Sequence, residues 1–271
     1  MEVQSGANDI ISAPYDGGSQ ARARLGDILA LKQAVAEPFG PCGWSKCNGC
    51  GFFRRCWNLA EGRHDVALVP DVDQGLVTAL RDAGVETIEQ LLGRFNEERL
   101  AVFQRPFGTR VQKVGKKAKV ILMQAKTLST GEEALLGTPS ISENPNYVMF
   151  DLEGLPPQLD EAEKIYLWGL QAFGTEPSEY RPAMADFGPD GDWHGWEGFL
   201  RNAEAIFEHY GNVPFVHWAS YEKSRMKTYI DRYGDSSGVA TRILDNLMDL
   251  HAQTKACIVL PLPSYSLKVV E

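Results

Sequence analysis

The sequence predicts a mixed α/β protein with two unlike halves. Residues 139–271 carry three strand-like segments followed by a helix, a strand and a helix, the order β-β-β-α-β-α. Residues 63–138 show short apolar stripes at helical spacing, broken by glycine, and are rich in Lys and Arg. Residues 1–62 hold a cluster of cysteines. We therefore expect three regions with these bounds, in which a helical part precedes an α/β domain.

Composition and charge narrow the class of protein. The chain has 44% apolar and 23% charged residues, no apolar run of membrane-spanning length and no leader, which predicts a cytoplasmic protein without a membrane partner. Net charge is −9, yet residues 94–126 carry nine Lys and Arg against two acids, and residues 131–200 carry fourteen acids against two basic residues. Basic stretches bind phosphate backbones and acidic clusters bind divalent cations, although either can be a solvated helix face.

Four of the five cysteines fall in one short run: Cys42, Cys47, Cys50 and Cys56. In a cytosolic chain such a cluster indicates metal binding rather than disulfides. Cys47 and Cys50 can converge on one metal, because Gly49 and Gly51 permit a tight turn. Uneven spacing and a shell of aromatic residues favour a [4Fe–4S] cluster over Zn²⁺, with zinc or no metal as alternatives. The shell consists of Trp44, Phe52, Phe53 and Trp57. Cys257 lies in an apolar stretch and is expected in the core.

The basic middle predicts helices joined by glycine turns. Residues 69–92 fit two short helices around Gly84, with Thr87 capping the second, which resembles a helix-hairpin-helix unit. A second such unit is expected around 107–108 and 114–117, continuing as a helix over 119–128. Hairpins of this kind bind nucleic-acid backbone through freed N–H groups and nearby basic side chains, although purely structural packing would give the same pattern. The candidate side chains are Arg110, Lys113, Lys116, Lys117 and Lys119.

The C-terminal half predicts three strands, then helix, strand and helix. The expected segments are 147–152, 164–170, 180–187, 193–210, 213–217 and 221–233. Asp151 and Glu153 end the first strand, and positions two apart share one face. Like charges this close call for a cation between them, and paired carboxylates suit the Mg²⁺ or Mn²⁺ of a two-metal phosphodiesterase. The alternative is that Asp151 merely ends the strand and Glu153 is solvated in the turn that follows.

The cysteine segment resembles the end of RecB-type nucleases that carry an iron–sulfur cluster. The shared pattern is Cys-x2-Cys-x5-Cys, at Cys47, Cys50 and Cys56. In that family the fourth ligand lies far upstream, so either Cys42 replaces it or it is missing. The RecB-type Asp…Glu-x-Lys centre has no counterpart before residue 41. The resemblance therefore implies a cluster and not RecB-type nuclease activity.

The region from residue 147 onward resembles the YprB-type ribonuclease-H-like domain of bacterial DEDD exonucleases. The match is carried by residues 150–154, 165–169, 217–222 and 264–271. The whole chain is thus similar to the central part of a RecB-like nuclease. The resemblance implies that Asp151 and Glu153 hold the metals and that Glu222 is the third acid, where the family more often has Asp. His217 opens the same motif, and Asp249 is a further candidate acid; a strand-end histidine and a helix-surface aspartate are the structural alternatives.

These patterns predict a metal-dependent nuclease of the DEDD type, a 3′–5′ exonuclease-like enzyme. Nucleic acid is the expected partner, with DNA single strands or ends favoured. The family's last acid would lie beyond Glu271, so we expect the chain to be incomplete at both ends and weakly active or inactive as it stands. The competing hypothesis is a non-catalytic nucleic-acid-binding module with a structural iron–sulfur or zinc site.

Overall fold

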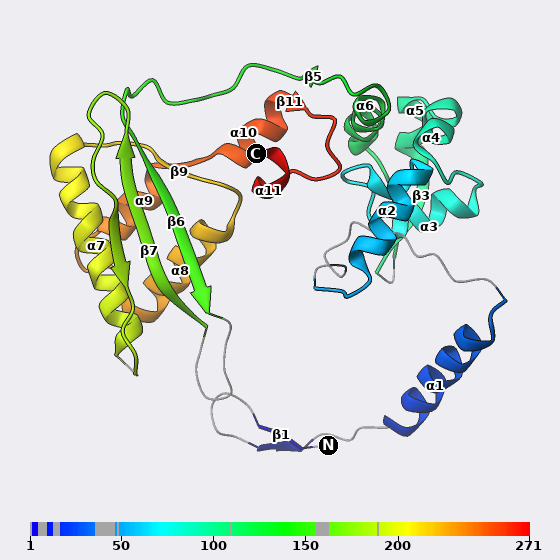
Figure 1. Ribbon diagram of the computed structural model, residues 1–271, viewed down its shortest axis with the longest axis horizontal. Helices are drawn as coiled ribbons and strands as arrows, with labels where there is room; N and C mark the ends of the chain where they lie inside the picture. Colours follow the sequence, from blue (N-terminus) through cyan, green and yellow to red (C-terminus); the bar gives the residue numbers. More distant parts are fainter. Residues whose placement is uncertain are drawn as a thin grey trace.

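The computed structural model describes residues 2–4, 10–12, 17–35, 47, 49–108, 110–155, 163–188 and 190–271, the first two ranges as backbone only. At the N-terminus β1 (Glu2–Gln4) pairs antiparallel with β2 (Ile10–Ser12), and helix α1 (Gly17–Gln33) follows with no buried residue. A helical unit and an α/β unit come next (Figure 1). None of the helices in these ranges combines the length and apolar character needed to cross a membrane.

The helical unit is a set of short elements around one apolar core. Leu76, Leu80 and Leu91 are fully or almost fully buried in it. The two predicted helices around a glycine turn are confirmed: Gly84 has φ +76°, and Thr87 forms a capping box. The helix predicted over 119–128 is also confirmed. The elements are α2 (Phe53–Arg63), η2 (Val66–Leu68), α3 (Gln74–Asp82), α4 (Ile88–Arg94), α5 (Glu97–Val102), β3 (Gln104–Phe107), β4 (Arg110–Lys113) and α6 (Lys117–Thr130).

The second predicted helix pair is wrong in its first half. Residues 107–108, expected at a turn between helices, belong to an antiparallel β-hairpin formed by β3 and β4. Pro106 explains the difference, because proline has no N–H to donate and is barred from a helix interior. Gly108, with φ +57°, lies in the connection between the strands, a conformation that glycine adopts without strain.

The α/β unit confirms the predicted order of elements and the mixed α/β class. The six predicted segments correspond to β6 (Tyr147–Leu155), β7 (Lys164–Phe173), β8 (Arg181–Met184), α7 (Gly191–Tyr210), β9 (Phe215–His217) and α8 (Tyr221–Tyr233). Next along the chain are α9 (Val239–Asp245), β10 (Leu247–Asp249) and α10 (Leu250–Cys257). The sheet has the order β10-β9-β6-β7-β8. Strand β6 is central: it pairs antiparallel with β7 and parallel with β9.

The core lies on one face of this sheet. Along β6, Val148, Phe150 and Leu152 are buried, while the residues between them are exposed. Trp168 of β7 is completely buried, with its ring centroid 4.6 Å from that of Phe199 on α7 and 4.7 Å from that of Tyr229 on α8. Helices α7, α8 and α9 all contribute to this cluster. The opposite face of β6 is therefore left to Asp151 and Glu153.

The C-terminal segment joins the two units. Cys257 is buried as expected, and β11 (Ile258–Val259) pairs with β5 (Ala134–Leu135) before the chain reaches α11 (Leu267–Val270). In Figure 1 this segment runs between the α/β unit and α6. The Thr127 hydroxyl of α6 donates to the Leu260 carbonyl at 3.3 Å.

Asp71 is the ionic centre of this junction. Its carboxylate lies 3.2 Å from Lys117 Nζ and 3.7 Å from Lys255 Nζ, and it accepts a hydrogen bond from the buried Gln124 amide at 3.3 Å. Burial alone would raise the pKa of Asp71, but Lys255, Lys117 and Gln124 together lower it below 3.8. Asp71 also has φ +64°, a left-handed conformation that few residues other than Gly, Asn and Asp adopt readily.

Asp71→Asn should lower the free energy of unfolding by about 1 kcal/mol at pH 7, since it removes the charge while keeping a residue that tolerates the left-handed backbone. Because the pKa of Asp71 is lowered in the folded state, its carboxylate stabilises the fold at pH values above the ordinary pKa of 3.8. This stabilisation is lost as the pH falls through the folded-state pKa. The difference between the proteins should therefore vanish in strong acid. Urea unfolding at pH 7 and in strong acid measures this difference in stability. Asp82→Asn, at an exposed position, is the control, and equal losses in both variants would contradict the assignment.

Candidate functional site

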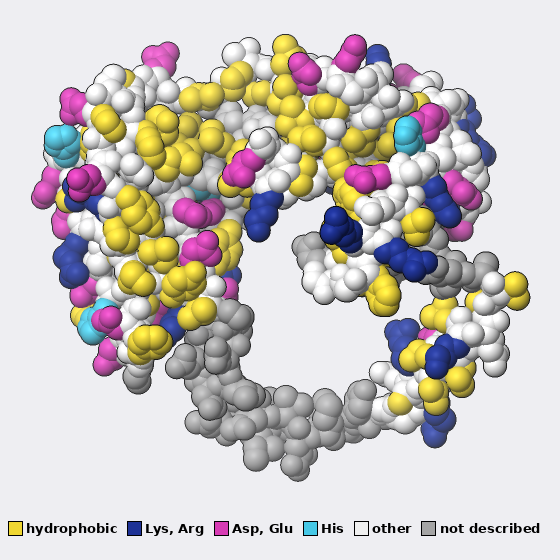
Figure 2. All heavy atoms as spheres, in the orientation of Figure 1, with side chains coloured by type: hydrophobic (Ala, Val, Ile, Leu, Met, Phe, Trp, Pro, Cys, Tyr) yellow, Lys and Arg dark blue, Asp and Glu magenta, His cyan; other side chains and the backbone are white. Residues whose placement is uncertain are grey.

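Four predicted residues lie in the region where the central strands end. Asp151 and Glu153 project from the open face of β6. Because Met149 pairs with Val216, Asp151 lies level with the end of β9, where the chain turns into α8. His217 ends β9 and Glu222 lies in the first turn of α8; both are buried, with His217 Nδ1 3.3 Å from Glu222 Oε2. In Figure 2, acidic and hydrophobic side chains lie side by side on the visible face of the α/β unit.

Asp151 is affected by the two acids near it. Burial raises the pKa of Asp151 above 3.8, and the charges of Glu153 and Glu222 raise it further, against a 3.0 Å hydrogen bond from the Leu152 N–H that lowers it. A carboxyl group that is both desolvated and surrounded by like charges is destabilised in its ionised form. Such a group attracts a proton or a cation, and perturbed acids of this kind are typical of functional sites.

The donor chemistry of this site fits Mg²⁺ or Mn²⁺, but no cage is preformed. Within the part of the chain that the structure describes, no three His, Cys, Asp or Glu side chains form a group able to hold a metal ion. Mg²⁺ keeps several waters and takes one or two carboxylates together with substrate phosphates, so it does not require such a cage. Asp151, Glu153 and Glu222 are the oxygen donors and the source of negative charge that the site could offer to such an ion.

Asp249 has a structural role that the sequence did not reveal. It ends β10 beside His217, rather than lying on a helix surface. Its Oδ1 accepts hydrogen bonds from the Ala252 N–H, which caps α10, and from the Ala219 N–H, both at 3.1 Å. Ala219 has φ +67°, an unfavourable conformation for a residue with a side chain. Asp249 therefore braces the loop that leads into the first turn of α8, and its role as a metal ligand stays a prediction.

Tyr221 belongs to the same site and was missed at the sequence level. Its hydroxyl lies against Gly154, where an added Cβ would be only 2.5 Å away. Burial raises the pKa of Tyr221, as do the charges of Glu163, Glu222 and Glu153, against a lowering effect of Arg225. No residue in the described ranges forms a hydrogen bond with this hydroxyl, so it can donate to a ligand. The only sequence signal was that Gly154 and Tyr221 each adjoin a candidate acid.

No family model, curated protein or solved structure matches this chain. Its chemistry is therefore inferred from the site itself. The ribonuclease-H-like and RecB-type resemblances stay predictions.

The cysteine segment is only partly described. Cys42 and Trp44 lie outside the described residues. The Cys50 N–H donates to the Cys47 carbonyl at 3.0 Å, and Gly49 has φ +76°, so the predicted tight turn is confirmed. Cys47 and Cys56 pack against a small apolar cluster of Ala60 and Leu68, whereas Cys50 is exposed.

The expected aromatic shell is wrong for two of its described members. Phe52 is 70% exposed and Phe53 is 37% exposed, because both lie at the outward-facing start of α2. Trp57 is half-buried and is hydrogen-bonded to Glu61 at 2.7 Å. These aromatic side chains do not shield Cys50 from solvent, and the iron–sulfur or zinc site stays a prediction.

The predicted basic side chains are exposed on β4 and the start of α6. Arg110 and Lys113 belong to β4, and Lys116, Lys117 and Lys119 follow the turn at Gly115. Lys117 forms an ion pair with Asp71, so its positive charge is partly neutralised at the junction. The other four side chains offer positive charge to solvent.

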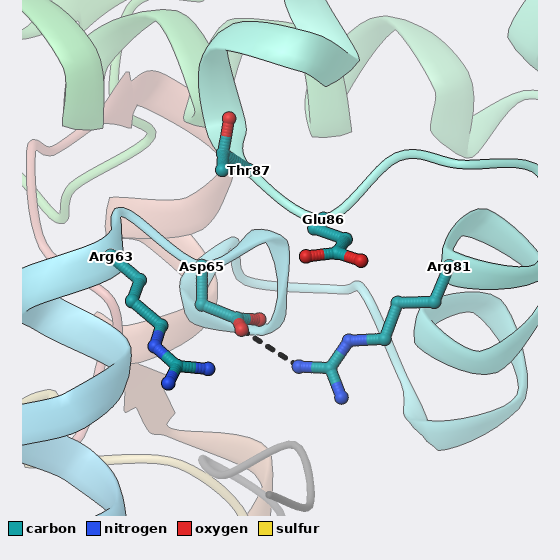
Figure 3. Close-up of a pocket in the computed structure, with 5 residues that line it drawn as sticks. All are labelled: Arg63, Asp65, Arg81, Glu86 and Thr87. Atoms are coloured by element: carbon teal, nitrogen blue, oxygen red, sulfur yellow. Dashed lines mark hydrogen bonds and ion pairs between the residues drawn. The ribbon is translucent and has the colours of Figure 1, made fainter.

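A separate pocket of about 440 Å³ in the helical unit has mixed charge (Figure 3). Arg63 and Arg81 reach toward it from either side of Asp65, with Glu86 beside them. Asp65 is buried, bonded to Arg81 at 2.7 Å and to the Ala67 N–H at 2.8 Å. Because two guanidinium groups face two carboxylates, the charges balance, and the Asp65–Arg81 pair mainly holds η2 against α3.

Asp151→Asn should raise the free energy of unfolding at pH 7. A carboxyl group whose folded pKa is raised destabilises the native state once it is ionised, so removing the charge relieves this cost. Below the ordinary pKa of 3.8 the group is protonated in both states and the gain should vanish. Thermal unfolding at both pH values tests this, with the exposed Asp186→Asn as the control. Destabilisation by Asp151→Asn at pH 7 would show that the carboxylate is structural.

Asp249→Ala should cost about 1 kcal/mol of stability through the lost helix cap and should speed amide exchange over residues 218–222. Asp249→Asn retains an oxygen acceptor and should keep most of both properties. Hydrogen exchange measures the loop directly. A large loss of Mn²⁺ affinity in the Asn variant, with the loop intact, would instead make Asp249 a ligand.

Proposed function

We propose that this chain is a metal-dependent nuclease whose α/β unit hydrolyses phosphodiester bonds, with DNA single strands or ends as the favoured substrate. The observation that carries the proposal is the raised pKa of Asp151 among Glu153 and Glu222 at the end of the central strand. The β-β-β-α-β-α order and the central position of β6 support a ribonuclease-H-like arrangement, with chemistry of the DEDD exonuclease type.

Asp151, Glu153 and Glu222 would hold Mg²⁺ or Mn²⁺, which when bound supplies a Lewis acid and a hydroxide source next to the scissile phosphate. The other residues orient these acids. His217 fixes the Glu222 carboxylate through its Nδ1, and Asp249 holds the loop from which α8 starts. The Tyr221 hydroxyl is protonated at neutral pH, and burial raises its pKa further, so it would serve as a hydrogen-bond donor to a phosphate oxygen.

The remaining regions supply substrate binding and a structural centre. The exposed basic residues of β4 and α6 would contact the nucleic-acid backbone without reading sequence. Cys47, Cys50 and Cys56, with Cys42, would hold a [4Fe–4S] cluster, or Zn²⁺ in its place, as a structural element.

A non-catalytic nucleic-acid-binding module is the second candidate. It is favoured by one observation: within the described ranges the acids do not form a three-ligand group, and Glu222 is already engaged by His217. In this case the acidic site would be a remnant and the basic stretch would carry the function.

Mn²⁺ binding followed by cleavage decides between the two. Titration of the metal-free protein should show Mn²⁺ binding that Asp151→Asn and Glu153→Gln each weaken about tenfold or more, since each removes one charged ligand. End-labelled single-stranded DNA should be shortened weakly, in line with the expected missing acid, and only with Mg²⁺ or Mn²⁺, and the same variants should abolish this. Glu133→Gln, an exposed acid before β5, is the control.

Two results would overturn the proposal. Mn²⁺ affinity equal in the wild type and Asp151→Asn would remove the metal site. Binding of DNA without any metal-dependent cleavage, at saturating Mn²⁺, would establish the non-catalytic module.

A further inference from the structure

The β3–β4 hairpin presents apolar and basic side chains together to solvent. Phe107 is 53% exposed and Val111 is 68% exposed, and all described residues of both strands are exposed or half-buried. Phe107 and Val111 lie on opposite faces of the hairpin, and Phe107 shares its face with Arg105 and Arg110. None of these residues takes part in the acidic site.

The hairpin is held firmly at its base. Arg105 pairs with Asp73 at 2.7 Å, and Asp73 caps α3 by accepting from the Leu76 N–H at 3.0 Å. Gly75 lies so close to the Pro106 carbonyl that any side chain at this position would overlap it. Strand β3 therefore packs directly on the first turn of α3, and the exposed residues are carried on a fixed support (Figure 1).

Phe107 is oriented by the same arginine. The Arg105 guanidinium lies 5.0 Å from the centroid of the Phe107 ring, which is a cation–π contact. The ring also borders an open pocket of about 420 Å³ that extends to Thr78 of α3. One side of the ring is thus supported by Arg105, and its exposed half remains for another planar group.

The surrounding charge selects an anionic partner. Residues 104–113 contain Arg105, Arg110 and Lys113 and no acid; Arg105 is paired with Asp73, so Arg110 and Lys113 carry the remaining positive charge. Arg110 is the strand partner of Phe107, so a positive charge lies directly beside the ring. A flat ring next to basic side chains fits the bases and phosphates of a single strand, whereas the bases of a duplex are already stacked on one another.

We propose that the β3–β4 hairpin binds single-stranded nucleic acid, with a base stacked on Phe107 and a phosphate on Arg110, its cross-strand partner on the same face. The inference deepens the proposed function, on which it rests for the class of substrate. It adds a stacking contact and a preference for unpaired strands, neither of which the acidic site supplies.

The test is binding of fluorescein-labelled oligothymidylate of about 15 nucleotides, measured by fluorescence anisotropy in EDTA so that no cleavage occurs. Phe107→Ala should weaken binding about tenfold, and Phe107→Tyr should retain it, because only the former removes the ring. Arg110→Ala should reduce the salt dependence of the affinity more than Lys113→Ala, because Lys113 lies on the other face of the hairpin, whereas Phe107→Ala should leave that dependence unchanged. The control is Phe187→Ala, which removes a fully exposed aromatic side chain of the α/β unit.

Unchanged affinity in Phe107→Ala, or equal losses in the Ala and Tyr variants, would overturn the inference. Equal affinity for a blunt duplex would do the same, as would Phe107-dependent binding to anionic lipid vesicles without binding to the oligonucleotide. Failure of the proposed function is a separate result: Phe107-dependent binding without cleavage in Mn²⁺ would remove the nuclease and leave the hairpin site standing.

Discussion

The alternation of side chains along β6 is the constraint on which the rest of the α/β unit depends. Burial of Val148, Phe150 and Leu152 under α7, α8 and α9 forces the residues between them onto the other face. The two acids can therefore not leave this face without a shift of register that would expose the core. The hydrophobic core thus holds Asp151 and Glu153 on the open face of the sheet, at a cost in the ionisation of Asp151.

A comparison with another buried carboxylate shows why this pair indicates function. Asp192 is more buried than Asp151, yet it accepts hydrogen bonds from the hydroxyls of Tyr229 and Tyr233 and pairs with Arg232 at 2.6 Å. Its charge is fully compensated, as expected of a structural residue. Asp151 has one backbone donor and two neighbouring acids. What distinguishes Asp151 from Asp192 is therefore its uncompensated charge and not its degree of burial.

Much of the α/β unit could be predicted because its elements are long and periodic. Strand β6 buries every second residue, and helix α7 buries every third or fourth residue. Both patterns can be recognised in the sequence. Strand β10 has three residues and β3 has four with a proline, too few to show a period. The contact of Tyr221 with Gly154 and the brace from Asp249 to Ala219 depend on tertiary packing, which local spacing does not encode.

The junction at Asp71 has a consequence for how the molecule folds. The α4–α6 and β6–β7 contacts join segments close in sequence, so both units can form early at little entropic cost. The C-terminal segment instead meets α6 through partners 133 residues apart, Thr127 and Leu260. Loop-closure entropy favours its docking last, after both surfaces exist. Contacts added late govern unfolding more than folding, so we expect this junction to control how fast the two units separate.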